Sequence, residues 1–301
     1  MKYKILVFFI FFALLGFVLT LATCVRVSEP SQKSADNTTA KRQPGVNNFT
    51  NYEHLYLGNP SNATPNESNY NNYLMEKPEY ALSYSRDRGT PNWVSWHVNR
   101  DWIGSAPRQD AFRPDATLPT GWYRVKTTSY SGSGFDRGHN CPSADRSNTP
   151  EANTATFLMT NIIPQAPTHN RDTWGNLEEY IRELVEQGQE CYITMGNYGV
   201  GGTGSSGLKE TIDKGNITVP SQIWKVVLIL PEGTDDGHRI DINTRIIAVN
   251  VPNINTVQAE WRNYLTTVDA IESATGYDLL SALPLNIQQV IEARVDKVPA
   301  R

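Results

Sequence analysis

Strand-like segments, separated by connections of irregular length, dominate this chain of 301 residues from about residue 52 onward. Two of them alternate in character as half-buried strands do, and others are short apolar runs typical of core strands. Helical patterns occur among them without regular alternation, which favours an α+β fold over a doubly wound parallel sheet. The expected strands are residues 80–85, 93–98, 157–163 (ended by Pro164), 191–195, 224–230 and 245–251.

The clearest helical pattern runs from Thr173 to Gln187 and is followed by Gly188, a common stop signal. Residues 256–267 and 268–275 are expected to form two further helices, the second ended by Gly276. The first helix should pack against the core along one face, because its apolar side chains recur at helical spacing. These side chains are Trp174, Leu177, Ile181, Leu184 and Val185.

The N-terminus carries an export signal. Lys2 and Lys4 precede an uncharged apolar run from Ile5 to Ala22, the order of a signal peptide. We favour cleavage of residues 1–24, with a retained membrane anchor as the alternative, because the run is nearly long enough to span a bilayer. Both readings place the rest of the chain outside the cytoplasm: secreted, periplasmic, or tethered to the envelope on the outer side of the cytoplasmic membrane.

Residues 25–50 are rich in Ser, Asn, Thr, Gln and Lys and are expected to form a disordered linker. Residues 51–301 then form a single domain. Two cysteines, Cys141 and Cys191, remain beyond the leader. In an oxidising compartment they could pair, or they could be two buried free thiols.

The formal net charge of the chain is −4 at pH 7. This weakens the case for a protein that coats nucleic acid by bulk charge, since such domains are usually strongly basic. An enzyme that holds phosphate with a few local arginines remains compatible with this charge.

Groups capable of acid–base and phosphate chemistry are concentrated in two clusters. The first is residues 135–146, with the sequence FDRGHNCPSADR, and the second is residues 161–182. A histidine, an asparagine, a glutamate and several arginines in one region would suffice for metal-assisted phosphodiester hydrolysis. Taken singly, each has a structural explanation: Glu178 and Arg182 would form a surface ion pair at i,i+4, and Asn170 would cap the following helix.

Their order and spacing, however, resemble the DNA/RNA non-specific endonucleases of the ββα-metal superfamily. The resemblance covers roughly residues 52 to 285 and implies a central, mainly antiparallel sheet with flanking helices. Asp-Arg-Gly-His alone is a weak signal, whereas the linked set of motifs is specific. The matching segments are 136–139 (DRGH), 142–146 (PSADR), 161–165 (NIIPQ), Asn170 through Trp174 to Glu178, Arg182, and, outside these clusters, 85–96, 108–110 and 275–279.

The resemblance implies a base and a metal site. His139 would act as general base and take a proton from the attacking water, a role suited to a side chain with an ordinary pKa of about 6.5. Asn170 would be the one direct protein ligand of Mg²⁺, with Mn²⁺ as a substitute, and Glu178 would hold metal-bound waters. The products would carry 5′-phosphate ends.

The resemblance also implies a set of phosphate-binding arginines. Arg108 and Arg182 would stabilise the negative charge that develops on phosphorus, and Arg137 would contact substrate phosphate. Asp136 would support the motif structurally. Contacts to phosphate carry no base information, so both DNA and RNA would be substrates, and a proteinaceous inhibitor is a possible partner of so unselective a nuclease.

The chain departs from the family pattern at Asn140, where the family often has Met, and in its acidic net charge. Neither change removes a catalytic group. One alternative function is a non-cleaving envelope protein that captures nucleic acid, and another is a phosphodiesterase acting on small nucleotides. The presence of His139, Asn170 and Glu178 argues against capture alone, which needs arginines but neither a base nor a metal ligand.

Overall fold

The computed structural model describes residues 53–297. The expected leader (residues 1–24) and linker (residues 25–50) lie outside the described residues, as do the first and last few residues of the expected domain. Within residues 53–297, no helix combines the length and the apolar character that a membrane span requires.

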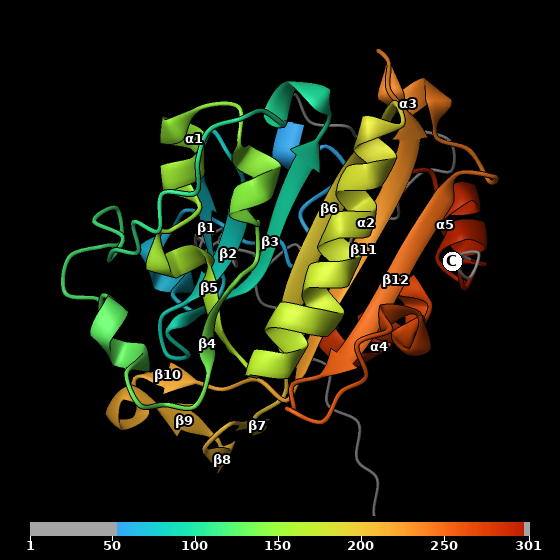
Figure 1. Ribbon diagram of the computed structural model, residues 1–301. Helices are drawn as coiled ribbons and strands as arrows, with labels where there is room; N and C mark the ends of the chain where they lie inside the picture. The colour runs from blue at the N-terminus through green and yellow to red at the C-terminus, as the bar shows by residue number, and fades with distance from the viewer. Residues whose placement is uncertain (1–52, 298–301) are drawn as a thin grey trace, which may run out of the picture. The chain divides into compact units, whose positions relative to one another are not determined.

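An antiparallel sheet of six strands forms the centre of the described part of the chain (Figure 1). Its spatial order is β1-β2-β3-β6-β11-β12, and all its neighbouring strands run antiparallel. The α+β expectation is therefore confirmed. The strands are β1 (Tyr73–Glu76), β2 (Ala81–Ser85), β3 (Thr90–Val98), β6 (Gln189–Tyr198), β11 (Gln222–Pro231) and β12 (Arg245–Pro252).

Both faces of this sheet are covered. The helix α2 (Gly175–Glu186) packs on one face, and its apolar stripe is buried as predicted. On the other face, α4 (Val268–Thr275) and α5 (Leu285–Ile291) contribute to a second apolar cluster. Because side chains of a strand alternate between faces, burial of both faces leaves β2 and nearly all of β3 buried. The expectation that these two strands are half-buried is therefore wrong.

A second, two-stranded sheet supports the motif region. It pairs β4 (Asp136–His139) with β5 (Ile162–Gln165). The expected strand 157–163 is replaced by a 3-10 turn (Met159–Asn161) followed by β5, which runs through Pro164. The side chain of Asn161 bonds to the backbone of Cys141 and Thr156, and these bonds hold the turn in place of strand pairing.

The expected helix at residues 256–267 is also wrong, because only a 3-10 turn at Trp261–Tyr264 forms there. Backbone carbonyls in this segment accept hydrogen bonds from outside it: Thr173 donates to Gln258 (2.8 Å) and Asn176 donates to Ala259 (3.1 Å). Tertiary contacts thus replace the helical bonds that local propensity favours. Two further two-stranded sheets pair β7 with β8 and β9 with β10. These strands and the remaining short elements are η1 (Glu53–Leu55), η2 (Glu67–Asn69), η3 (Arg100–Trp102), η4 (Thr127–Tyr130), η5 (Ser143–Arg146), α1 (Pro150–Ala155), β7 (Gly202–Gly204), β8 (Gly207–Lys209), β9 (Thr211–Ile212), η8 (Asp213–Gly215), β10 (Ile217–Thr218) and α3 (Asp236–Arg239).

The two cysteines are separate, fully buried thiols. Burial raises the pKa of Cys141 to about 12 and also raises the pKa of Cys191. Of the two readings left open by the sequence, the structure has the free thiols. Both are inert in this state because the thiolate is the reactive form of cysteine.

Stability should depend on pH through Glu272 on α4. Burial, together with Asp278 and Asp269, raises the pKa of Glu272 from 4.5 to about 7. A carboxyl with a raised pKa stabilises the fold below its unfolded pKa, and that stability is lost as pH rises through 7. For this half-buried group we expect Glu272→Gln to be more stable than wild type at pH 8 by about 1 kcal/mol, with the advantage vanishing by pH 4.5.

Urea unfolding of both proteins at pH 4.5 and pH 8 measures this difference. The amide of the variant retains an oxygen that can accept the Leu279 N–H bond made by Glu272 (2.6 Å), so the change isolates the charge. The exposed Glu232 supplies a matched control, Glu232→Gln, for which the two pH values should give the same difference. A Glu272→Gln effect of equal size at both pH values would contradict the assignment.

Candidate active site

The motif region forms a ββα unit. The strands β4 and β5 pair from Asp136 opposite Gln165 to His139 opposite Ile162. The chain then enters a π-helical segment, His169–Trp174, which continues directly into α2. A side chain at position 138 would clash, because its Cβ would lie 2.7 Å from the Cβ of Gln165, an atom that side-chain rotation cannot move. This close packing of β4 on β5 explains the glycine between Arg137 and His139.

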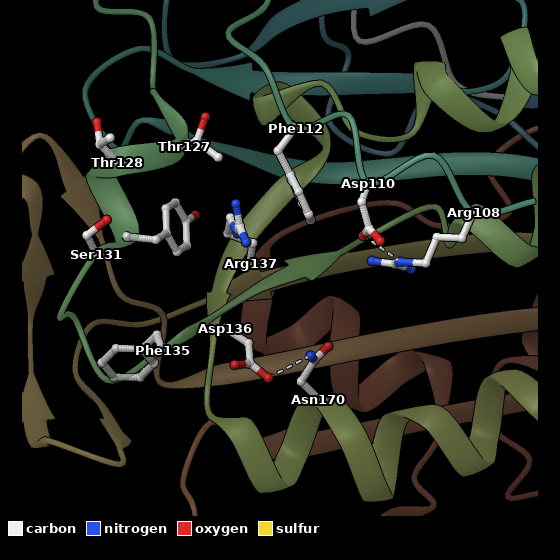
Figure 2. A pocket seen from close by; sticks show the side chains of 11 residues that line it. Arg108, Asp110, Phe112, Thr127, Thr128, Ser131, Phe135, Asp136, Arg137 and Asn170 are labelled. Carbon is white, nitrogen blue, oxygen red and sulfur yellow. Dashed lines mark hydrogen bonds and ion pairs between the residues drawn. The ribbon is translucent and has the colours of Figure 1, made fainter.

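A hollow of about 520 Å³ opens beside this unit. Figure 2 shows Asp136 and Asn170 together on one side, with Arg137, Phe112 and Arg108 around them. Three of the predicted site residues, Arg108, Arg137 and Asn170, therefore share one cavity. Its lining is Arg108, Asp110, Phe112, Thr127, Thr128, Tyr130, Ser131, Phe135, Asp136, Arg137 and Asn170.

Asp136 fixes the orientation of Asn170. The amide nitrogen of Asn170 donates to Oδ2 of Asp136 (3.0 Å), and Arg171 donates to both carboxylate oxygens (2.9 and 2.8 Å). The amide oxygen of Asn170 is consequently turned away from Asp136 (Figure 2). This contact differs from the helix cap considered as the structural explanation of Asn170. Arg171, which the sequence did not single out, balances the charge of Asp136.

His139 lies between two aromatic rings beside the hollow. Its ring is 4.9 Å from that of Phe157 and 5.3 Å from that of Phe112, centroid to centroid. Nε2 is enclosed and makes no hydrogen bond within the described residues. Burial, and secondarily the charges of Arg108 and Arg137, lower the pKa of His139 to about 3. The pKa of His139 thus lies below the ordinary value of 6.5, because the surroundings oppose a second proton on the ring.

The turn after His139 is held by hydrogen bonds of Asn140. Asn140 is fully buried, and both its backbone and side-chain nitrogens donate to the carbonyl of Asn161 (2.9 Å each). The departure from Met at this position thus adds a hydrogen bond to the turn. It removes no group from the hollow.

The two arginines of the hollow are held by different partners. Arg108 donates to Asp110 (2.8 Å) and to the hydroxyl of Ser143 (2.9 Å). Arg137 stacks on Phe112, with its guanidinium carbon 4.0 Å from the ring centroid. Phe112 therefore contacts both Arg137 and His139, a role that no sequence motif indicated. Asp110 balances Arg108 and Arg171 balances Asp136, so the positive charge that remains in the hollow is that of Arg137.

Glu178 and Arg182 lie on α2 but do not line this hollow. Each pairs with a residue outside its helix: Arg182 with Asp145 (3.2 Å) and Glu178 with the buried Lys225 (3.6 Å). The i,i+4 surface pair considered from the sequence is thus replaced by two partly buried pairs. Burial raises the pKa of Glu178 and lowers the pKa of Lys225, while each charge opposes the shift of the other.

The oxygen donors of the helical segment 169–186 fit Mg²⁺. The amide oxygen of Asn170 is a hard oxygen ligand held in place by Asp136, and Glu178 lies farther along the same continuous helical segment. Mg²⁺ prefers oxygen ligands and retains several waters, so one direct protein ligand and one carboxylate reached through water suit it.

Two other carboxylate clusters in the described part of the chain are less suited to the cofactor. In the group of His97, Glu190 and Asp236, the guanidinium of Arg239 already pairs with both carboxylates. The second group, Asp269, Glu272 and Glu292, belongs to α4 and to the chain just after α5. Neither group includes a residue of the ββα unit.

The family model described as DNA/RNA non-specific endonuclease matches residues 57–286. A nuclease of Nostoc sp. is 54% identical over 243 residues, covering 81% of this chain and 86% of that protein. Mitochondrial endonuclease G of Homo sapiens is 30% identical over 210 residues, covering 67% of this chain and 68% of that protein.

A solved structure shares the fold. The crystal structure of an EndoG/EndoGI complex superimposes with a TM-score of 0.61 at 22% identity, covering 76% of this chain and 90% of that chain. This likeness supports the ββα-metal fold expected from the motifs.

Proposed function

The chain belongs to the DNA/RNA non-specific endonuclease family, and from this premise we propose that it is an Mg²⁺-dependent nuclease that hydrolyses DNA and RNA without regard to sequence or sugar. Nuclease activity itself follows from the family. The observation that supports the finer proposal is the hollow in which Arg108, Arg137 and Asn170 meet, with His139 packed beside it on Phe112.

In this proposal His139 is the general base. Its lowered pKa keeps the imidazole neutral at physiological pH. Phosphate bound between Arg108 and Arg137 would offset the two charges that lower this pKa and would raise it toward the range in which a general base works. Nε2 is enclosed, which leaves Nδ1 as the nitrogen that accepts the proton of the attacking water.

The arginines bind phosphate. Arg108 and Arg137 reach the hollow from two sides and hold the phosphate oxygens as negative charge grows on them. Arg182 lies outside the hollow and is neutralised by Asp145, so the support for its role in stabilising charge on phosphorus is the resemblance to the family. These groups contact phosphate and do not contact the base or the 2′-hydroxyl. The site therefore accepts any sequence and both sugars.

Asn170 and Glu178 hold the metal in this proposal, Asn170 directly and Glu178 through water. Bound there, Mg²⁺ (or Mn²⁺) would supply the charge that stabilises a departing 3′ oxygen. The 5′-phosphate ends expected of the products follow from that leaving group.

Export and control complete the proposal. The support for export is the run Ile5–Ala22 behind Lys2 and Lys4. An unselective nuclease would also cut the nucleic acid of its own cell, which is the reason to propose a protein inhibitor made alongside. The similarly folded EndoG is bound by EndoGI in its crystal structure.

Incubation of the purified protein with circular plasmid and with RNA tests this function. We expect both substrates to be lost with Mg²⁺ and to remain intact with EDTA, because the developing charge needs the metal. Product ends are checked by ligation before and after phosphatase treatment. Tight binding of both nucleic acids without cleavage, in Mg²⁺ and in Mn²⁺, would instead support the capture protein, and cleavage of dinucleotides alone would support the small-nucleotide phosphodiesterase.

A further inference from the structure

Lys225 is a charged residue at the centre of the sheet. It lies on β11 between Ile223 and Val227, which point to the same face and belong to the apolar cluster under α2. The side chain of Lys225 has no exposed surface. Lysine is almost never fully buried unless it is paired, because an ammonium group taken out of water loses its favourable solvation. The fold would be served better here by an apolar residue.

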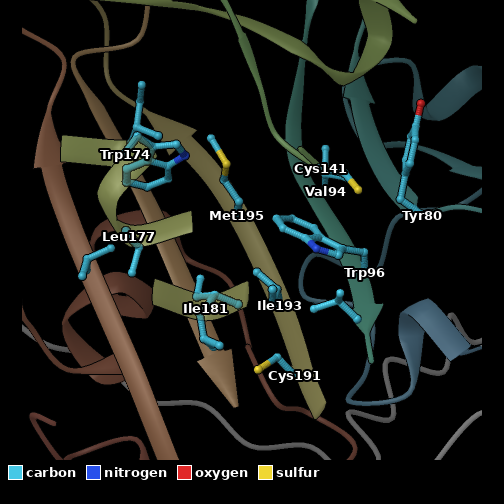
Figure 3. Close-up of a cluster of buried hydrophobic side chains, with 14 of the residues drawn as sticks. Tyr80, Val94, Trp96, Cys141, Trp174, Leu177, Ile181, Cys191, Ile193 and Met195 are labelled. Carbon is cyan, nitrogen blue, oxygen red and sulfur yellow. The ribbon is translucent and has the colours of Figure 1, made fainter. Parts of the chain in front are cut away.

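The surroundings of the ammonium point to one carboxylate. Nζ lies 3.6 Å from Oε1 of Glu178 and makes no hydrogen bond at 3.5 Å or less within the described residues. It also lies over two indole rings, 4.7 Å from the centroid of Trp174 and 5.6 Å from that of Trp96. Figure 3 shows these two tryptophans on either side of Met195 in the buried cluster.

Trp174 connects this position to the metal site. It is the last residue of the π-helical segment that carries Asn170, and Glu178 follows one turn later in α2. Lys225 therefore contacts the same helical segment at two points, through the ring of Trp174 and through the carboxylate of Glu178.

The neighbouring ion pair leaves Lys225 as the cation for Glu178. Arg182, four residues along α2, is engaged by Asp145 (3.2 Å), and Asp145 is itself held by the indole N–H of Trp96 (3.0 Å). Two carboxylates and two cations thus form two ion pairs beneath α2, and the pairs also act on each other, since Arg182 lowers the pKa of Glu178 after Lys225 does. Removal of Lys225 would leave Glu178 without its ion-pair partner.

We propose that Lys225 is a positioning residue for the metal site: its ammonium holds one carboxylate oxygen of Glu178, so that the other oxygen is turned toward the water retained by the metal. This role rests on the proposed function of Glu178. Second-sphere groups of this kind typically contribute 10- to 100-fold to metal affinity.

Binding of Mn²⁺, followed by the electron paramagnetic resonance signal of the free ion, tests this role without any cleavage reaction. We expect Lys225→Met, which keeps the length of the side chain and removes its charge, to weaken Mn²⁺ binding about 10- to 100-fold. The exposed Lys297 provides the control Lys297→Met, which should bind Mn²⁺ as wild type does.

If Lys225→Met alone folds poorly, a double-mutant cycle with Glu178→Gln still tests the role of Lys225. Lys225→Met combined with Glu178→Gln carries no unpaired buried charge and is compared with Glu178→Gln alone. If Lys225 acts through Glu178, the lysine substitution changes Mn²⁺ affinity less than about twofold in this background. An equally large loss with and without Glu178, or unchanged affinity in Lys225→Met, would overturn the positioning role.

Measuring nucleic-acid cleavage by the wild-type protein distinguishes failure of the role of Lys225 from failure of the proposed nuclease function. Normal cleavage together with unchanged Mn²⁺ affinity in Lys225→Met overturns the role of Lys225 alone. A wild-type protein that neither cleaves nucleic acid nor binds Mn²⁺ overturns the proposed function, and the inference with it.

Discussion

Substitution of His139 by alanine is expected to lower the rate of plasmid and RNA cleavage by about 10²–10⁴-fold, the usual contribution of a general base. The imidazole of His139 packs between Phe157 and Phe112, and Phe112 lines the hollow together with Arg108 and Arg137. Its lowered pKa keeps it neutral. Initial rates at saturating Mg²⁺, measured for both substrates, give the size of the loss.

Two controls separate the loss of a base from a loss of structure. The histidine His238 is exposed and distant in sequence from the motif, so His238→Ala should cleave at the wild-type rate. Added imidazole should restore part of the activity of His139→Ala, because the ring fills the space between the two phenylalanines and supplies the missing base. If His139→Ala retained more than a few per cent of wild-type activity, the base assignment would be wrong.

The sequence predicted those elements whose pattern is local. The stripe from Trp174 to Val185 indicated α2, and Gly188, at φ +84°, ends it as expected. The apolar runs that became β6, β11 and β12 were also found, since strands buried on both faces read as nearly continuous hydrophobic segments.

The remaining features depend on contacts between distant segments, which local patterns do not contain. The helix expected at residues 256–267 is absent because Thr173 and Asn176 bond to its backbone carbonyls. The sheet order places β3 beside β6, although the whole motif region lies between these two strands in the sequence. Neither the π-helical start of α2 nor the placement of Lys225 under it has a signal in its own sequence.

The same distinction applies to the candidate site. The linked motifs predicted Arg108, Arg137 and Asn170, which the fold brings to one hollow. They did not predict Phe112, which stacks on Arg137 and His139, or Arg171, which neutralises Asp136. A motif identifies the groups that carry the chemistry, whereas the residues that hold them are set by packing.

The largest effect on the metal is expected at Asn170. Substitution by alanine removes the one direct protein ligand proposed for Mg²⁺ and leaves Asp136 paired with Arg171. A metal ion contributes several kcal/mol to stabilisation of developing charge, and each 1.36 kcal/mol is a factor of about ten in rate. We therefore expect Asn170→Ala to lower cleavage by at least about 10²-fold and to weaken Mn²⁺ binding measured by calorimetry.

The dependence of activity on Mg²⁺ concentration distinguishes loss of a metal ligand from loss of folded structure. For Asn170→Ala, activity should rise with Mg²⁺ only at concentrations well above those that saturate wild type, while the unfolding midpoint without metal stays the same. The exposed Asn263 supplies the matched control Asn263→Ala, whose titration should coincide with that of wild type. An unchanged Mg²⁺ titration in Asn170→Ala would remove Asn170 as the ligand, and Asp136, whose carboxylate lies 3.0 Å from the Asn170 amide nitrogen, would become the next oxygen donor to test.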